Sequence, residues 1–165
     1  MMVPFKAQND ISGILPNSPA IKVGSPQIAQ AFTITRTDLQ RLLILLDSHF
    51  VETVGNGRTH LKELQSRLER ATVVDPREML PDIVTMNSTF NLFDLDRSEA
   101  DTFTLVYPKE ACIAEGKLSI LSPLGAESFG RRVGESLTLN ILKLPTRKRI
   151  DKMSFQPERS GAFDL

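Results

Sequence analysis

The spacing of the apolar residues changes once along this 165-residue chain, at Asp75-Pro76. Before this point, leucines recur at the spacing of a helix. From Ile83 onward, short segments alternate between apolar and polar residues, as half-buried strands do. A helical segment followed by a run of strands is typical of an α+β fold. The sequence therefore predicts an α+β protein in which the helices come first.

Residues 36–71 predict two amphipathic helices joined by a short turn. Thr37 and Gln40 have the spacing of a capping box at the start of the first helix. The apolar stripes consist of Leu39, Leu42, Leu43, Leu46 and Phe50, and then of Leu61, Leu64, Leu68 and Ala71. The other face of the second helix carries Lys62, Glu63, Arg67, Glu69 and Arg70. Gly55-Asn56-Gly57 suits a turn, so the helices should pack antiparallel. Each helix is too short to be stable alone, so the hairpin must rest on another part of the chain.

Short strands with one short helix are predicted after the hairpin. The expected strands are residues 84–93, 102–107, 117–121, 136–142 and 148–155. Between the third and the fourth of them, residues 124–132 predict about two turns of helix.

The first 32 residues differ from the rest, because prolines interrupt them and neither a helical nor a strand period persists. The sequence therefore predicts a flexible leader at 1–32, a helical hairpin at 33–80 and a strand domain at 81–165.

The composition excludes several function classes. Lys plus Arg number 20 and Asp plus Glu also number 20, so net charge gives no reason to expect non-specific binding of nucleic acid. Cys112 is the only cysteine, which excludes an intrachain disulfide and a cysteine-rich zinc site. The longest strongly apolar run, Leu42 to Leu46, is too short to span a bilayer. We therefore expect a cytoplasmic protein without membrane contact.

Residues 125–132, Gly-Ala-Glu-Ser-Phe-Gly-Arg-Arg, have the glycine spacing of a phosphate-binding loop. Such a loop needs a Lys after its second glycine and then a Ser or Thr that binds magnesium. This chain has Arg131, Arg132 and Val133 there, and Gly134 would end the following helix almost at once. We expect no nucleotide and no other cofactor at this stretch.

Three stretches of the strand region resemble a known family. They are VTMNSTFNLFDLD at 84–96, FTLVYPKEACIAEGKLSILSPLGAESFGRRVGES at 103–136 and FQPERSGAFDL at 155–165. They resemble the C-terminal domain of the Gre transcript-cleavage factors, which has an FKBP-like fold. More closely, they resemble the bacterial regulator-of-nucleoside-diphosphate-kinase (Rnk) family. The resemblance covers about residues 36–165. The hairpin matches the family in its layout, and the strand region matches it in its sequence motifs.

The resemblance implies an FKBP-like antiparallel β domain with one short helix, preceded by a short coiled coil. It also implies binding to RNA polymerase near its secondary channel, with no direct sequence-specific contact to nucleic acid. In such proteins the Ser-Pro-Leu-Gly stretch closes a strand and starts the short helix, and Gly130 and Gly134 would be turn glycines. The candidate polymerase-docking residues are Ser122, Pro123, Leu124, Gly125, Arg131 and Arg132. Cys112 departs from the family, which usually has Asp there, so identical surface contacts do not follow.

In Gre factors, acidic residues at the tip of the coiled coil help to hold magnesium in the polymerase active site. The only acidic residues near this tip are Asp47 and Glu52, whose spacing puts them on different sides of a helix. A helix of roughly 18 residues spans about 27 Å, whereas Gre hairpins are much longer. The sequence therefore predicts a monomeric, non-enzymatic regulator of the Rnk type that binds polymerase without stimulating transcript cleavage.

Two alternative functions stay open at this point. The first is a true Gre-type cleavage and elongation factor. The second is an FKBP-type peptidyl-prolyl isomerase, which the composition disfavours because such active pockets are lined with aromatic residues and this chain has one Tyr and no Trp.

Other polar groups are weaker candidates for a site. His49 and His60 flank the turn of the hairpin, but no carboxylate is well placed to complete a metal site with them. The acidic turn at 94–101 lacks the glycine and the final glutamate of a calcium loop. Residues 145–149 include three cations in a row, which suit either a solvated hairpin end or an electrostatic contact with a partner.

Overall fold

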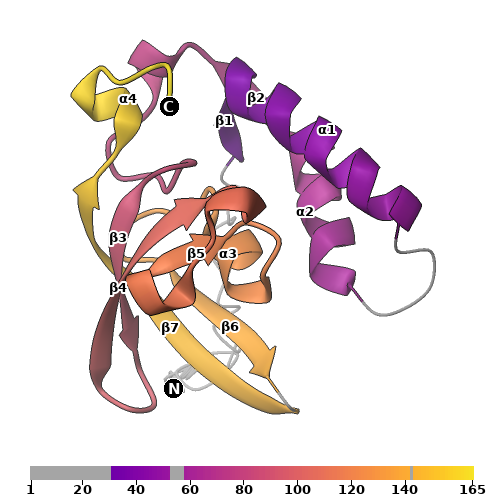
Figure 1. Cartoon of the computed structure of the whole chain (residues 1–165). Helices are drawn as coiled ribbons and strands as arrows, with labels where there is room; N and C mark the ends of the chain where they lie inside the picture. The colour runs from indigo at the N-terminus through magenta and orange to yellow at the C-terminus, as the bar shows by residue number, and fades with distance from the viewer. Residues whose placement is uncertain (1–30, 53–57, 142) are drawn as a thin grey trace, which may run out of the picture. The chain divides into compact units, whose positions relative to one another are not determined.

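Two helices precede a curled sheet in the chain, as Figure 1 shows. The computed structural model describes residues 31–52, 58–141 and 143–165. The α-helices of this part are α1 (Arg36–Glu52), α2 (Thr59–Glu69), α3 (Pro123–Ser128) and α4 (Pro157–Ser160). Its strands are β1 (Thr33–Thr35), β2 (Thr72–Val74), β3 (Thr89–Asp94), β4 (Glu99–Val106), β5 (Lys117–Ser119), β6 (Ser136–Ile141) and β7 (Leu144–Phe155). The short 3-10 helices are η1 (Pro76–Glu78), η2 (Pro108–Glu110) and η3 (Ile113–Glu115).

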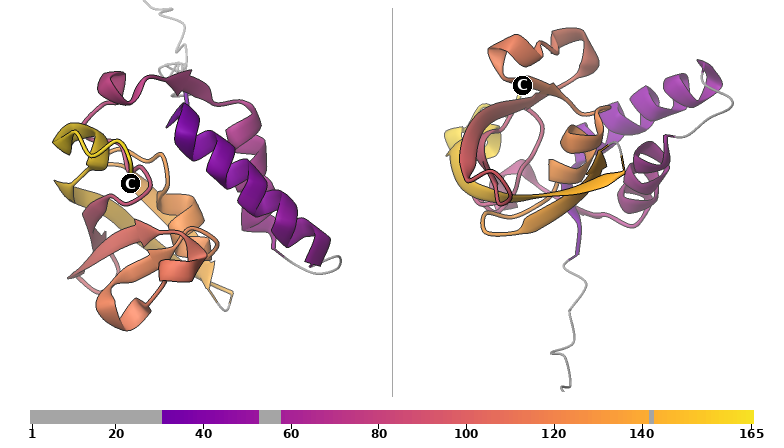
Figure 2. Two further views of the ribbon diagram at one scale, coloured as in Figure 1. Left: turned by 45° about the horizontal axis from the view of Figure 1, so that its top comes forward. Right: turned by 90° about the horizontal axis from the view of Figure 1, so that it is seen from below.

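The larger sheet has five strands in the order β5-β4-β3-β7-β6. All neighbours in it are antiparallel except β4 and β5, which run parallel. The two views of Figure 2 show the sheet curling, with α1 and α2 together beside it. The short helix α3 contacts α2 as well as β5 and β6. The predicted mixed fold, with helices first and a mainly antiparallel sheet after them, is confirmed.

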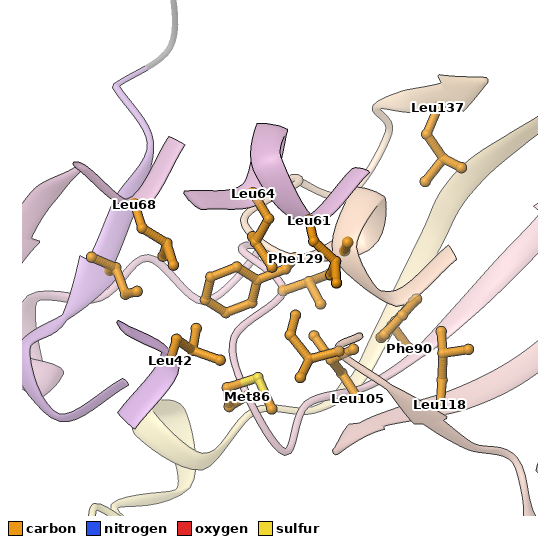
Figure 3. Close-up of a cluster of buried hydrophobic side chains, with 14 of the residues drawn as sticks. Leu42, Leu61, Leu64, Leu68, Met86, Phe90, Leu105, Leu118, Phe129 and Leu137 are labelled. Carbon is orange, nitrogen blue, oxygen red and sulfur yellow. The ribbon is translucent and has the colours of Figure 1, made fainter. Parts of the chain in front are cut away.

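A single apolar cluster joins the helices to the sheet, and Figure 3 shows part of it. It includes Leu42 and Leu46 of α1, Leu61, Leu64 and Leu68 of α2, Phe129 after α3, and Phe90, Leu92, Leu105, Leu118 and Leu137 of the sheet. Burying each such side chain stabilises the fold by about 1.5–3 kcal/mol. The hairpin therefore rests on the sheet, as its short helices require. Leu43 belongs to the predicted stripe but is 37% exposed, because it lies beside the buried face of α1.

The first helix begins one residue before the predicted capping box. The amide of Asp38 donates to the hydroxyl of Thr35 at 3.2 Å, and α1 begins at Arg36. The residue that caps a helix has an extended backbone, and here the chain is still extended at Thr35, the last residue of β1. The prediction that Thr37 caps the helix is therefore wrong.

A two-stranded parallel sheet connects the start of the hairpin to its end, although the sequence predicts no strand at either place. β1 pairs with β2 in the register Thr33–Thr72 to Thr35–Val74. Just before β1, the half-buried ring of Phe32 packs edge to face on Phe129, with the ring centroids 5.5 Å apart. Phe32 was assigned to the leader, but it belongs to the packed part of the chain. Residues 1–30 of the predicted leader lie outside the described residues.

The first strand of the large sheet starts later than predicted. Residues 84–88 precede β3 and form a turn, in which Asn87 has a φ of 61°. The hydroxyl of Ser88 accepts a hydrogen bond from the amide of Thr85 at 3.1 Å. Burial of Val84 and Met86 produced the alternating pattern, although neither residue lies in a strand.

Candidate docking surface at α3

The Ser-Pro-Leu-Gly stretch begins α3, as predicted. The hydroxyl of Ser122 accepts a hydrogen bond from the amide of Gly125 at 3.0 Å and donates to the carbonyl of Ser119 at 2.6 Å. Pro123 occupies the first turn of the helix, where its missing N–H is no loss. The side chain of Ser122 therefore caps α3 and joins it to the end of β5.

Three glycines around α3 occupy positions that favour glycine. A Cβ on Gly125 would overlap the carbonyl oxygen of Ser119, so the helix lies directly on the backbone that precedes it. Gly130 and Gly134 have φ angles of 75° and 93°, a region that favours glycine. The prediction that these two are turn glycines is confirmed.

The two candidate arginines lie beyond the other end of α3 and are already paired. Arg131 forms a salt bridge with Glu127 at 3.1 Å, and Arg132 forms one with Asp82 at 2.7 Å. Both pairs are partly exposed, and such pairs contribute only about 0–1 kcal/mol to stability. Pro123 is exposed, whereas Gly125 is buried. Ser122, Leu124 and the two arginines are partly exposed, so every candidate residue except Gly125 offers accessible atoms on this surface.

Two side chains of α2 contact the backbone on either side of α3. The Nε2 atom of His60 lies 3.0 Å from the carbonyl oxygen of Leu121, and because a carbonyl only accepts, the ring donates this hydrogen bond. The guanidinium of Arg67 donates to the carbonyl of Ala126 at 3.1 Å and to that of Phe129 at 2.6 Å. The helical pattern of the sequence predicts that Arg67 lies on the solvent face of α2, whereas its side chain is partly buried against α3. Its spacing from Leu64 and Leu68 puts it at the border of the apolar stripe, and this spacing was the available signal.

A buried carboxyl group that the sequence pattern does not predict lies at the start of α1. Asp38 is 5% exposed and accepts a hydrogen bond from the hydroxyl of Tyr107 at 3.3 Å. Burial, together with the nearby charge of Glu158, raises the pKa of Asp38 to about 6. Burial also raises the pKa of Glu158, which accepts a hydrogen bond from Thr85 at 2.7 Å. The charge of Arg41 opposes the rise at Asp38. These groups line or adjoin a small cavity between α1, η1 and α4.

The residues proposed from the hairpin tip are only partly described. Asp47 lies on α1 with an exposed side chain. The side chains of Glu52 and His49 and all of Gly55-Asn56-Gly57 lie outside the described residues. His60, the other histidine considered as a metal ligand, forms a hydrogen bond with the carbonyl of Leu121.

The cationic run at 145–149 contacts the acidic turn between β3 and β4. Lys148 forms a largely buried salt bridge with Asp94 at 2.8 Å. Its hydrogen bond is the main reason why the pKa of Asp94 falls to about 2. Arg147 pairs with Asp96 at 3.0 Å, and Arg149 with Asp151 at 2.9 Å. These pairs assign the run a structural role at the β3–β7 end of the sheet.

Within the described ranges, no group of three or more His, Cys, Asp or Glu side chains is placed to share a metal ion. In the same ranges, no helix combines the length and the apolar character needed to cross a membrane.

Comparison with known proteins identifies the class to which this fold belongs. Residues 72–151 match the family model of the C-terminal part of the transcription elongation factors GreA and GreB. A solved structure titled as a prokaryotic transcription elongation factor GreA/GreB from Nitrosomonas europaea is 34% identical, with a TM-score of 0.64. That match covers 75% of this chain and 99% of the other. The fold is that of a GreA/GreB-like transcription factor.

The helical part of the chain shows which family of GreA/GreB-like proteins it belongs to. Residues 31–74 match the family model of the Rnk N-terminus. The regulator of nucleoside diphosphate kinase of Escherichia coli K12 is 32% identical over 133 residues, which cover 80% of this chain and 95% of that protein. A transcription elongation factor GreA of Thermodesulfovibrio yellowstonii is also 32% identical, over 82% of this chain and 86% of its own length. The chain therefore belongs to the family of the regulator of nucleoside diphosphate kinase, within the GreA/GreB-like transcription factors.

Proposed function

We propose that this protein is a non-enzymatic transcription regulator that binds RNA polymerase near the secondary channel and does not stimulate transcript cleavage. The observation that carries the proposal is the combination of a GreA/GreB-type sheet with a short Rnk-type hairpin in one chain. The relatives are named as regulators or elongation factors. Membership of this family is our reason for proposing RNA polymerase as the partner.

The surface around the start of α3 is the proposed point of contact. Ser122, Pro123, Leu124 and Gly125 form one rigid corner, because the Ser122 cap and the tight approach of Gly125 to Ser119 fix the backbone. A preformed corner loses little conformational entropy when a partner binds it. Arg131 and Arg132, each paired with a carboxylate, lie near the opposite end of α3.

The size of the hairpin supports the absence of cleavage activity. The 17 residues of α1 span about 25 Å, and the 11 residues of α2 span about 16 Å. A carboxylate must lie within about 2.1 Å of a magnesium ion to bind it. An Asp or Glu side chain reaches only a few ångströms, so a hairpin that stops short of the active site supplies no ligand there.

We also propose a fold type and domain boundaries for this chain. We take the sheet with α3 as FKBP-like and the α1–α2 pair as a short coiled coil, and we divide them into a hairpin at 33–80 and a strand domain at 81–165. Isomerase activity fits poorly, since Phe90 and Phe129 are fully buried in the core. We further propose that the protein is a monomer. We also propose that it lies in the cytoplasm, because the polymerase it would bind lies in that compartment.

A transcript-cleavage assay on stalled polymerase complexes tests the functional claim. We expect the protein to leave cleavage at the intrinsic rate of the polymerase, because its hairpin delivers no carboxylate to the catalytic magnesium. The assay should include a GreA factor as a positive control and the variants Asp47→Ala and Glu52→Ala alongside the wild type. Stimulated cleavage that disappears in either variant would show a Gre-type cleavage factor instead.

A further inference from the structure

We propose that helix α2 holds the docking corner at α3 in its binding conformation, and that His60 and Arg67 are positioning residues for polymerase binding. The inference rests on the proposed function, because it concerns the same surface. It adds that the hairpin controls how tightly the sheet binds its partner, through two side chains that need not touch the polymerase themselves.

The two contacts fall on either side of the short helix. His60 donates to the carbonyl of Leu121, the residue immediately before the Ser122 cap. Arg67 donates to the carbonyls of Ala126 and Phe129, near the end of α3. His60 and Arg67 are seven residues apart on α2, which is about two turns or 10 Å. The six residues of α3 span about 9 Å, so α2 reaches both ends of α3.

The short helix depends on such contacts, since a helix of this length is not stable by itself. Its start is capped by Ser122, and at its end the carbonyls of Glu127 and Ser128 accept hydrogen bonds from the side chain and the amide of Arg131. Arg67 satisfies two carbonyls there, and its positive charge is favourable at a helix C-terminus. Removal of Arg67 would leave these partly buried carbonyls without their donor.

Arg67 is built into the structure rather than lying on its surface. Its guanidinium carbon lies 4.6 Å from the centroid of the Phe32 ring, which is cation–π distance. Burial, followed by the charge of Arg131, lowers the pKa of Arg67. Among the described residues no carboxylate forms a salt bridge with it, so its polar contacts in that part of the chain are with the backbone around α3. A side chain held in this way transmits any displacement of α2 to the docking corner.

Full-length variants measured against purified RNA polymerase test this inference. We expect His60→Ala to weaken binding by about threefold to tenfold, the value of one hydrogen bond. Arg67→Lys should weaken it by about tenfold, because an ammonium group cannot replace the two-pronged contact of a guanidinium. His60→Gln, whose amide can donate to the same carbonyl, should recover part of the loss. Lys62→Ala, on the exposed face of the same helix, should bind like the wild type.

Hydrogen exchange on the free protein separates positioning from a general loss of structure. The amides of Gly125, Ala126 and Phe129 donate to Ser122 or Gly125 of this corner. They should exchange faster in His60→Ala and Arg67→Lys, whereas amides of β3 should be unchanged. If the amides of Arg67→Lys lose protection throughout the protein, this variant is destabilised as a whole, and the inference is then tested by the His60 variants alone. Wild-type affinity in His60→Ala, or exchange at α3 that does not change, would overturn the inference. Failure of the wild type itself to bind polymerase would instead refute the proposed function, and the exchange result would still report whether α2 holds α3.

Discussion

Replacement of Phe129 with alanine is expected to lower the free energy of unfolding by about 3–5 kcal/mol, the usual cost of removing a buried aromatic ring. Phe129 is 1% exposed and packs edge to face on Phe32. Figure 3 shows its ring among the leucines of α2 and close to Met86. The ring therefore links the start of the packed chain to the hairpin, within the apolar cluster that extends into the sheet. The loss should appear as a lower urea midpoint with an unchanged slope, if unfolding remains two-state.

Phe163→Ala is the matched control for this variant. Phe163 is 41% exposed, so its removal should lower the free energy of unfolding by less than about 1 kcal/mol. Similar losses for the two variants would mean that the aromatic cluster is not the centre of the core. Two separate unfolding transitions in the wild type would mean that the hairpin and the sheet do not share one core.

The stability of the protein is expected to rise as the pH falls from about 8 to about 5, opposite to the usual effect of a native carboxylate. The pKa of Asp38 is about 6 in the folded protein and 3.8 when unperturbed, so the folded state binds the proton more tightly. The stabilising contribution of protonation is complete below the unperturbed pKa and is lost as the pH rises through about 6. From pH 8 to pH 5 this contribution grows by about 1.4 kcal/mol, and it reaches about 3 kcal/mol only below the unperturbed pKa. Denaturant unfolding at a series of pH values measures it.

Asp38→Asn should remove most of this pH dependence, because the amide carries no charge at any pH. The remaining slope should come mainly from Glu158, whose pKa is also raised by burial. Below about pH 4 the trend should reverse in both proteins as Asp94, whose pKa is lowered by Lys148, becomes protonated. An identical pH dependence in wild type and Asp38→Asn would refute the assignment of the slope to Asp38.

The order of the elements could be predicted from the sequence because each segment carries its own periodic signal. Leu61, Leu64 and Leu68 mark the buried face of α2, and Leu137 and Leu139 alternate with exposed residues in β6. The start of α3 was expected from the family resemblance, and the Ser122 cap and Pro123 that stabilise it involve only neighbouring residues.

The long-range contacts could not be predicted in the same way. β1 and β2 have three residues each, too few to show a period, and their partners lie far apart in the chain. The contacts of Arg67 are with backbone carbonyls, which leave no mark on the identity of the partner residues. Asp38 is a common residue for the first turn of a helix, and only the fold places Tyr107 and Glu158 beside it.

Direct binding of the full chain to purified RNA polymerase, with and without a GreA factor as competitor, tests the central claim most directly. We predict saturable binding that the competitor displaces, because both proteins would occupy the same site near the secondary channel. Absence of binding, or binding that an excess of GreA leaves unchanged, would contradict the account.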